Sequence, residues 1–123
     1  MAVLIDSSSW IEALRQNGKT DVRKRVQDLL AAGQAAWCDP VRLELWNGAR
    51  GVQEKKVLGQ LDQTLRSLPV DDRVWELAVD LAQKARDNGL TTPALDLIIV
   101  ACARHHGVTL EHNDQHLTAL LAL

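Results

Sequence analysis

The fold of this 123-residue chain is decided by the stretch Ala2-Val-Leu-Ile-Asp6-Ser-Ser-Ser-Trp10-Ile-Glu12. Four apolar residues run without interruption into Asp6, and three serines follow before a helical pattern begins. An unbroken aliphatic run bounded by small polar residues is typical of a central strand of a parallel sheet, which is buried on both faces. Ligands of open parallel sheets bind just beyond the carboxyl ends of the strands. Asp6 stands at that position, so other acidic residues at the same edge would define a site.

The rest of the chain predicts a parallel α/β fold. Short apolar runs at 35–38 and 108–110 are further strands, and 68–70 is a brief extended piece. Amphipathic or apolar helical patterns separate these strands. The expected helices cover about residues 10–16, 21–32, 39–50, 52–67, 72–87, 93–106 and 115–121. We expect one domain over 1–123, a three-layer α/β/α sandwich with a central parallel sheet of four or five strands.

Composition excludes several classes of protein. The apolar fraction of 46% and the charged fraction of 24% are ordinary for a soluble globular domain. The longest apolar run, 97–103, is far shorter than the about 20 residues needed to cross a bilayer. No secretory signal is visible at the amino terminus, so we expect a cytoplasmic protein without a membrane partner. Cys38 and Cys102 make no metal-binding spacing and are expected to be buried free thiols in a reducing cytosol.

The net charge of −2 gives no global basic footprint of a nucleic-acid binder. Basic residues nevertheless concentrate in the first half of the chain, which is compatible with a local basic surface. The alternative is a set of solvated helix faces of mixed charge. These residues are Arg15, Arg23, Lys24, Arg25, Arg42, Arg50, Lys55 and Lys56.

One acidic residue directly follows the first strand, and another lies in the helix that follows the second strand. Asp6 lies at the end of the first strand; the alternative is that it only caps the next helix, a role for which three serines are already available. Glu44 lies about one turn inside the helix that leaves the second strand, between apolar neighbours, so the same sheet edge is within its reach. A surface glutamate near a helix start, stabilised by the helix dipole, is an equally open interpretation.

Asp96 is the most informative acid. It lies in Pro93–Ala103, a helix that is apolar on nearly every face, and burying an unpaired carboxylate is costly. No basic residue occurs between Asn88 and Ala103, so a divalent cation would serve as its partner. The alternative is a partly exposed aspartate in the first turn, stabilised by the helix dipole.

Asp114 follows the last strand, so the same edge is within its reach. It is also placed to cap the last helix, and the two roles are compatible. His112 and His116 have the i, i+4 spacing of a helical metal pair. Without a third nitrogen or sulfur ligand nearby, zinc is not expected.

Carboxylates at the ends of successive strands form an oxygen-only site, which suits Mg²⁺ or Mn²⁺. The sequence has no glycine-rich phosphate loop and no G-x-S-x-G motif. The chemistry that such a site supports without another cofactor is phosphodiester hydrolysis. Bound cations would also let an acidic protein bind a polyanion.

At these residues the chain resembles the PIN-domain nucleases, and within them the VapC-type toxins of VapBC toxin–antitoxin systems. Order, spacing and length agree over almost the whole chain. The matching segments are Val3–Glu12, Val41–Leu45, Pro93–Ala103 and Asn113–Leu117. The chain departs from the family in stopping at Leu123, where another strand is usual, and in having His112 where a hydroxyl or basic residue is more usual.

The resemblance implies a Mg²⁺- or Mn²⁺-dependent endoribonuclease toxin. Its acidic cluster would be Asp6, Glu44, Asp96 and Asp114, with Ser7 or Ser8 orienting a metal ligand or water and Asn113 in support. Toxins of this kind cut RNA of the translation machinery, tRNA or rRNA. They commonly form homodimers and are held inactive by a cognate antitoxin protein.

Two alternatives are open. A receiver-like signalling domain would also cluster aspartates around Mg²⁺, but it needs paired acids after the first strand and a lysine after a late strand. This chain has Asp6 alone and no lysine after Lys84. A PIN-fold RNA-binding module without catalysis is the second, and the presence of all four acids disfavours it.

Overall fold

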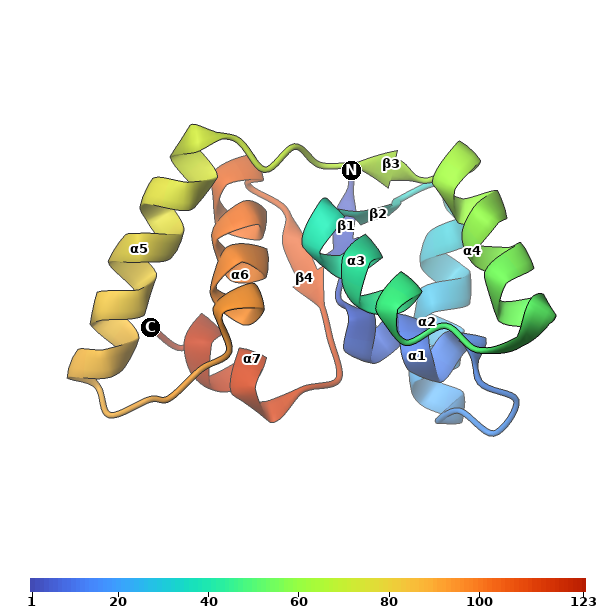
Figure 1. Cartoon of the computed structure of the whole chain (residues 1–123), viewed down its shortest axis with the longest axis horizontal. Coiled ribbons are helices and arrows are strands. Elements are labelled where there is room, and N and C mark those ends of the chain that lie inside the picture. Colours follow the sequence, from blue (N-terminus) through green and yellow to red (C-terminus); the bar gives the residue numbers. More distant parts are fainter.

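The computed structural model covers residues 1–123 and contains a four-stranded parallel sheet flanked by seven helices (Figure 1). The strand order is β3-β2-β1-β4. The strands are β1 (Val3–Ile5), β2 (Ala35–Trp37), β3 (Arg66–Ser67) and β4 (Thr109–Glu111). The helices are α1 (Ser7–Leu14), α2 (Thr20–Ala31), α3 (Asp39–Asn47), α4 (Gly51–Thr64), α5 (Asp72–Asp87), α6 (Ala94–His106) and α7 (Gln115–Leu121). The predicted parallel α/β architecture is confirmed.

Burial along the two central strands shows that helices cover both faces of the sheet. Successive strand residues point to opposite faces, yet Leu4 and Ile5 of β1 are both fully buried, as is Ala36 of β2. In Figure 1, α5, α6 and α7 lie on the β4 side of the sheet and α4 lies on the β3 side. The core is mostly aliphatic, with Trp10 and Trp37 packed edge to face at a centroid distance of 6.3 Å.

The register of the central strands sets the position of the site. β1 pairs with β2 on one side and with β4 on the other, and Ile5 is the register partner of Glu111. The Asp6 backbone N–H donates to the Glu111 carbonyl at 2.9 Å. The residues that follow β1 and those that follow β4 therefore leave the sheet side by side.

Several local expectations are wrong. The third strand is Arg66–Ser67 rather than 68–70, and it lies within the helix expected over 52–67, which ends at Thr64. Both strand residues are exposed, so no apolar pattern marks this edge strand. The helix expected over 39–50 ends at Asn47.

Helix α1 begins at Ser7, three residues earlier than expected, because Asp6 itself is the N-cap. Its Oδ2 accepts a hydrogen bond from the Ser8 backbone N–H at 3.0 Å. The serines therefore do not replace Asp6 as the cap.

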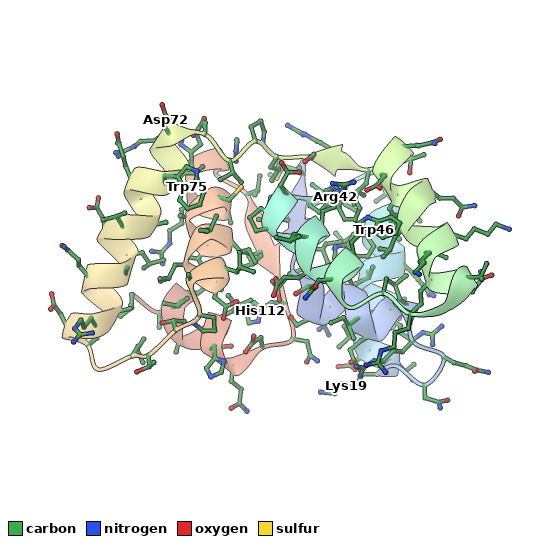
Figure 2. All side chains as sticks on the ribbon, in the orientation of Figure 1. Lys19, Arg42, Trp46, Asp72, Trp75 and His112 are labelled. Atoms are coloured by element: carbon green, nitrogen blue, oxygen red, sulfur yellow. The ribbon has the colours of Figure 1, made fainter.

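The expectation that Cys38 and Cys102 are buried free thiols is confirmed. At the surface, Asp71 caps α5 by accepting from the Val74 backbone N–H. None of the helices combines the length and the apolar character that crossing a membrane requires. Figure 2 shows the side chains on the ribbon, with Trp46 on α3 and the half-exposed Trp75 on α5.

The loop between α1 and α2 depends on a glycine. A Cβ at Gly18 would collide with the backbone carbonyl oxygen of Glu12. Since the backbone must shift to admit a methyl group, we expect Gly18→Ala to lower the stability by about 1–3 kcal/mol. Gly59, inside α4, has open space around its Cβ position, so Gly59→Ala should raise stability by about 0.5–1 kcal/mol. Thermal unfolding followed by circular dichroism tests both, and shifts of the same sign would contradict this explanation.

Candidate active site

The four predicted acids converge at the carboxyl edge of the sheet. Asp6 follows β1, Asp114 follows β4, Glu44 lies on α3 and Asp96 lies in the first turn of α6. They are close enough for their charges to interact: burial is the main cause that raises the pKa of Glu44, and the negative charges of the other three acids raise it further. Segments more than one hundred residues apart in sequence thus contribute to one site.

Asp6 is held by its own helix but has a free oxygen. Its side chain is only 2% exposed, and Oδ2 accepts from the backbone N–H and, at 2.6 Å, from the hydroxyl of Ser8. Oδ1 is buried and has no hydrogen-bond donor. A buried carboxylate oxygen without a donor is costly unless a cation or water approaches it. This oxygen is therefore a candidate ligand atom.

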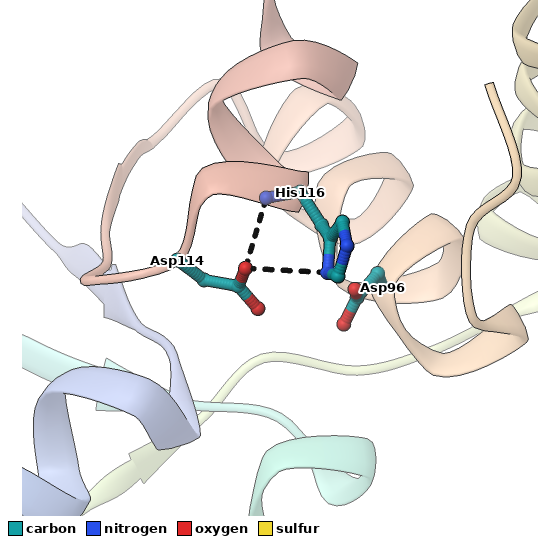
Figure 3. A group of neighbouring side chains, drawn as sticks. All are labelled: Asp96, Asp114 and His116. Carbon is teal, nitrogen blue, oxygen red and sulfur yellow. Dashed lines mark hydrogen bonds and ion pairs between the residues drawn. The ribbon is translucent and has the colours of Figure 1, made fainter.

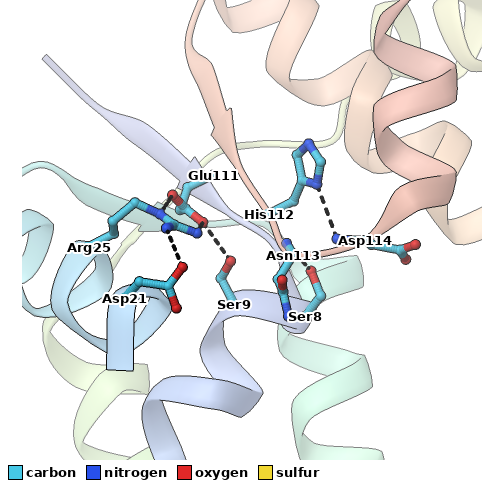
Figure 4. Close-up of polar contacts among 8 residues, drawn as sticks. All are labelled: Ser8, Ser9, Asp21, Arg25, Glu111, His112, Asn113 and Asp114. Carbon is cyan, nitrogen blue, oxygen red and sulfur yellow. Dashed lines mark hydrogen bonds and ion pairs between the residues drawn. The ribbon is translucent and has the colours of Figure 1, made fainter. Parts of the chain in front are cut away.

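The three supporting residues connect the acids to one another; two of them, Ser8 and Asn113, are drawn in Figure 4. The Ser7 hydroxyl donates to Glu44 Oε1 at 3.1 Å, which ties α1 to α3. The Ser8 hydroxyl donates to Asp6 and accepts from the Asn113 backbone N–H at 2.9 Å. Asn113 therefore contributes through its backbone. These bonds fix the segment after β1 against the segment after β4.

Asp96 is buried, 7% exposed, and makes no side-chain hydrogen bond or ion pair within the chain. Burial and the nearby charges of Asp114 and Asp6 raise the pKa of Asp96 to about 6, and His116 acts in the opposite direction. Burial also raises the pKa of Glu44, against the hydrogen bond from Ser7 that lowers it. The site therefore concentrates negative charge that a cation would neutralise.

Asp96, Asp114 and His116 form the most compact group of metal-ligand side chains, with one donor atom from each within 4.8 Å of the others (Figure 3). Asp114 caps α7, since its Oδ1 accepts from the His116 backbone N–H at 2.9 Å. The expected cap at Asp114 is thus confirmed, and the capping carboxylate is also a member of this compact group. Asp6 and Glu44 lie outside this compact group.

The site residues selected from the sequence did not include His116, although its ring belongs to this compact group. Its i, i+4 neighbour His112 is not part of the group, and His112 Nδ1 instead accepts from the Asp114 backbone N–H at 3.2 Å. The N-cap aspartate is the signal that could have indicated His116. The carboxylate of an N-cap residue accepts a hydrogen bond from the backbone N–H two positions later, so the side chain at that position begins next to the carboxylate.

A second polar network joins α1, α2 and the end of β4. Glu111, at the end of β4, accepts from the Ser9 hydroxyl at 2.7 Å and from Arg25 Nε at 2.8 Å. Asp21 completes it as an ion-pair partner of Arg25 (Figure 4). This network holds α1 and α2 against β4, and nothing in the sequence pattern indicated it.

The predicted local basic surface is partly neutralised. Arg25 is paired with Glu111, and Arg42 is paired with Asp62. Arg15 makes an ion pair of 3.5 Å with Glu12, and its side chain stays exposed. Arg15 and the exposed Arg50 line a cavity of about 440 Å³ that also reaches Glu44 and Glu54. The cavity beside the acids is therefore of mixed charge, with two arginines available to a polyanion.

The donor set fits a divalent cation. Carboxylate oxygens are the usual ligands of Mg²⁺ and Mn²⁺ in proteins. Asp6 Oδ1 and the carboxylate of Asp96 are both buried without a donor from the chain. We conclude that the residues at this edge are suited to hold such an ion.

Comparison with known proteins agrees with this geometry. The sequence matches the PIN domain family over residues 3–120. It is similar to VapC ribonuclease Mb1587 of Mycobacterium bovis, with 32% identity over 91% of this chain and 86% of that protein. It is also similar to ribonuclease VapC21 of Mycobacterium tuberculosis, with 31% identity over 83% of this chain and 76% of that protein.

Solved structures share the fold at low identity. DNA-bound VapBC from Salmonella typhimurium superposes with a TM-score of 0.79 at 16% identity, over 97% of this chain and 91% of the other. VapC20 of Mycobacterium tuberculosis, a toxin that cleaves the sarcin–ricin loop, gives 0.70 at 20% identity, over 96% and 94%. Family match, sequence relatives and fold agree: the chain belongs to the PIN domain family and, within it, to the VapC group.

Proposed function

We propose that this chain is a Mg²⁺- or Mn²⁺-dependent endoribonuclease and the toxin of a VapBC toxin–antitoxin module, with the catalytic domain spanning residues 1–123. The observation that supports it best is the convergence of four acids around buried carboxylate oxygens that lack donors. The two sequence relatives described above are named as ribonucleases, which supports RNA as the substrate.

In the proposed mechanism, Asp6, Asp96 and Asp114 hold the cation and Glu44 completes the acidic cluster. The bound ion would activate a water molecule and stabilise the charge on the phosphate and on the leaving oxygen. The Ser8 hydroxyl orients the Asp6 carboxylate, because it donates to Oδ2 and leaves Oδ1 free. The Ser7 hydroxyl orients Glu44 in the same way.

The proposed substrate is RNA of the translation machinery, either tRNA or rRNA. Arg15 and Arg50 beside the cavity at Glu44 would bind its phosphates and bring the backbone to the acids. One structural neighbour is a toxin that cleaves the sarcin–ricin loop, which supports ribosomal RNA as one target class.

The proposed partners are a cognate antitoxin and a second copy of this chain, all in the cytoplasm. Several structural neighbours are VapBC complexes, which supports an antitoxin that covers the site. Membership of the PIN family argues against the receiver-like alternative.

Metal removal tests the proposal. Purified protein should cleave single-stranded or looped RNA when Mg²⁺ or Mn²⁺ is present, and cleavage should fall by at least about 100-fold in excess EDTA and return on adding the ion. Gel analysis of end-labelled RNA measures this. Full activity in EDTA would contradict the metal mechanism. Tight RNA binding without cleavage in the presence of either Mg²⁺ or Mn²⁺ would favour the non-catalytic binding module.

A further inference from the structure

We propose that His116 is a direct nitrogen ligand of the cation held by Asp96 and Asp114, and that it makes this site prefer Mn²⁺ over Mg²⁺. The inference rests on the proposed metal-dependent function and adds a ligand and a selectivity to it. The all-oxygen site expected from the four acids thereby becomes a mixed site of carboxylates and one imidazole.

The geometry places the imidazole where a ligand must lie. Donor atoms of Asp96, Asp114 and His116 lie within 4.8 Å of one another. Ligands about 2.1 Å from a six-coordinate ion are separated by about 3 Å when adjacent and about 4.2 Å when opposite. Side-chain movements of about 1 Å would therefore bring all three atoms onto one ion.

Asp114 is fixed in position, whereas the ring of His116 is free to rotate. Asp114 is fixed by capping α7, and the backbone N–H of His116 is the group that it accepts, so the two residues share one anchored turn. The His116 ring is 65% exposed and its Nδ1 lies 3.5 Å from Asp114 Oδ1 (Figure 3). Since the ring is free of packing constraints, it can rotate onto an ion at low cost.

A second observation indicates that a ligand belongs here. Asp6 is only 2% exposed, and its Oδ1 accepts no hydrogen bond from the chain. The side chain of Asp96, at 7% exposure, likewise makes no hydrogen bond or ion pair within the chain, and it is close enough to Asp6 for the two charges to interact. A bound cation would compensate both carboxylates, and the exposed imidazole of His116 lies beside Asp96.

Ligand chemistry then decides which ion is preferred. Mg²⁺ binds oxygen ligands and keeps its water, so an imidazole adds little to its affinity. Imidazole is a ligand of first-row transition metals, whose affinities rise from Mn²⁺ towards Cu²⁺. One nitrogen donor therefore shifts the site towards Mn²⁺ relative to Mg²⁺.

The test uses the full chain loaded with Mn²⁺ and electron spin-echo envelope modulation, which detects nitrogen coupled to the bound ion. We expect ¹⁴N modulation in the wild type, its loss in His116→Gln and its retention in His112→Gln. His112 is the matched control because it is a nearby imidazole whose Nδ1 already accepts a backbone hydrogen bond. His116→Gln keeps the backbone N–H that Asp114 accepts, so α7 stays capped.

Binding constants give the second measurement. By competition against free Mn²⁺ in electron paramagnetic resonance, His116→Gln should bind Mn²⁺ about 10-fold more weakly, with less than about a 3-fold change for Mg²⁺. Mn²⁺ binding without ¹⁴N modulation in the wild type, or an equal loss for both ions, would overturn the role of His116 and leave the proposed function intact. No binding of Mn²⁺ at millimolar concentration would overturn both.

Discussion

Asp96→Asn is expected to lower RNA cleavage by at least about 100-fold and, at the same time, to raise the melting temperature of the metal-free protein. The loss of activity follows from removing a buried carboxylate ligand. The gain in stability follows from removing a buried charge that nothing in the chain compensates, because Asp96 is 7% exposed and has no hydrogen-bond or ion-pair partner.

The sign of the stability change follows from the linkage between proton binding and folding. The pKa of Asp96 is raised from 3.8 to about 6, so the folded protein binds the proton more tightly than the unfolded chain does. This favourable contribution is complete below about pH 4 and is lost as the pH rises through about 6. Because solvent screens part of this charge, we expect a difference on the order of 1 kcal/mol between the two ends of that range. In EDTA, the wild type should therefore be relatively more stable at pH 5 than at pH 8.

Thermal unfolding in EDTA at pH 8 measures the effect. The melting temperature of Asp96→Asn should exceed that of the wild type by about 5 °C, and the difference should shrink towards pH 4. Asp80→Asn, on the exposed face of α5, is the matched control and should change neither stability nor cleavage. A lower melting temperature for Asp96→Asn at pH 8 would show that the Asp96 charge is compensated within the chain.

Asp6→Asn and Asp6→Ala should both abolish cleavage, with a loss of at least about 100-fold, but they should differ in stability. Asp6 has two roles on two oxygens: Oδ2 caps α1, and Oδ1 is the unpartnered atom. Asparagine caps a helix as well as aspartate does, whereas alanine loses the cap at a cost of about 1 kcal/mol. Only the charge is lost in the first variant, and both charge and cap are lost in the second.

Cleavage assays and melting temperatures of the two variants separate these roles. Growth of cells that express the chain without an antitoxin gives a third readout: the wild type should arrest growth and Asp6→Asn should not. Equal melting temperatures for the two variants would contradict the capping role. Retained cleavage in Asp6→Asn would remove Asp6 from the proposed cluster.

Much of the fold could be predicted because its central elements follow from local patterns. The unbroken apolar run before Asp6 predicted β1, and the apolar helix around Asp96 predicted α6. β3 could not be predicted at Arg66–Ser67, since an exposed two-residue edge strand is specified by its pairing with β2 and not by hydrophobicity.

The candidate site was predictable in its acids and not in its other groups. Acids that follow parallel strands must meet at one edge, so topology alone brought Asp6 and Asp114 together. His116 and Glu111 depend instead on how a loop turns and on which side chains it meets. Such tertiary contacts have no periodic signature in the sequence.

The hydrogen bond from the Asn113 backbone to the Ser8 hydroxyl spans 105 positions of the chain, and that from Ser9 to Glu111 spans 102. Contacts of such sequence separation form late, because the chain entropy of closing a long loop must be overcome first. During translation, β1 and α1 are made early but have no β4 to pair with, and Asp6 has no Asp114 beside it. The proposed cluster of acids is therefore expected to assemble only after residues 109–114 have been synthesised, so the nascent chain stays without this site until its synthesis is nearly complete.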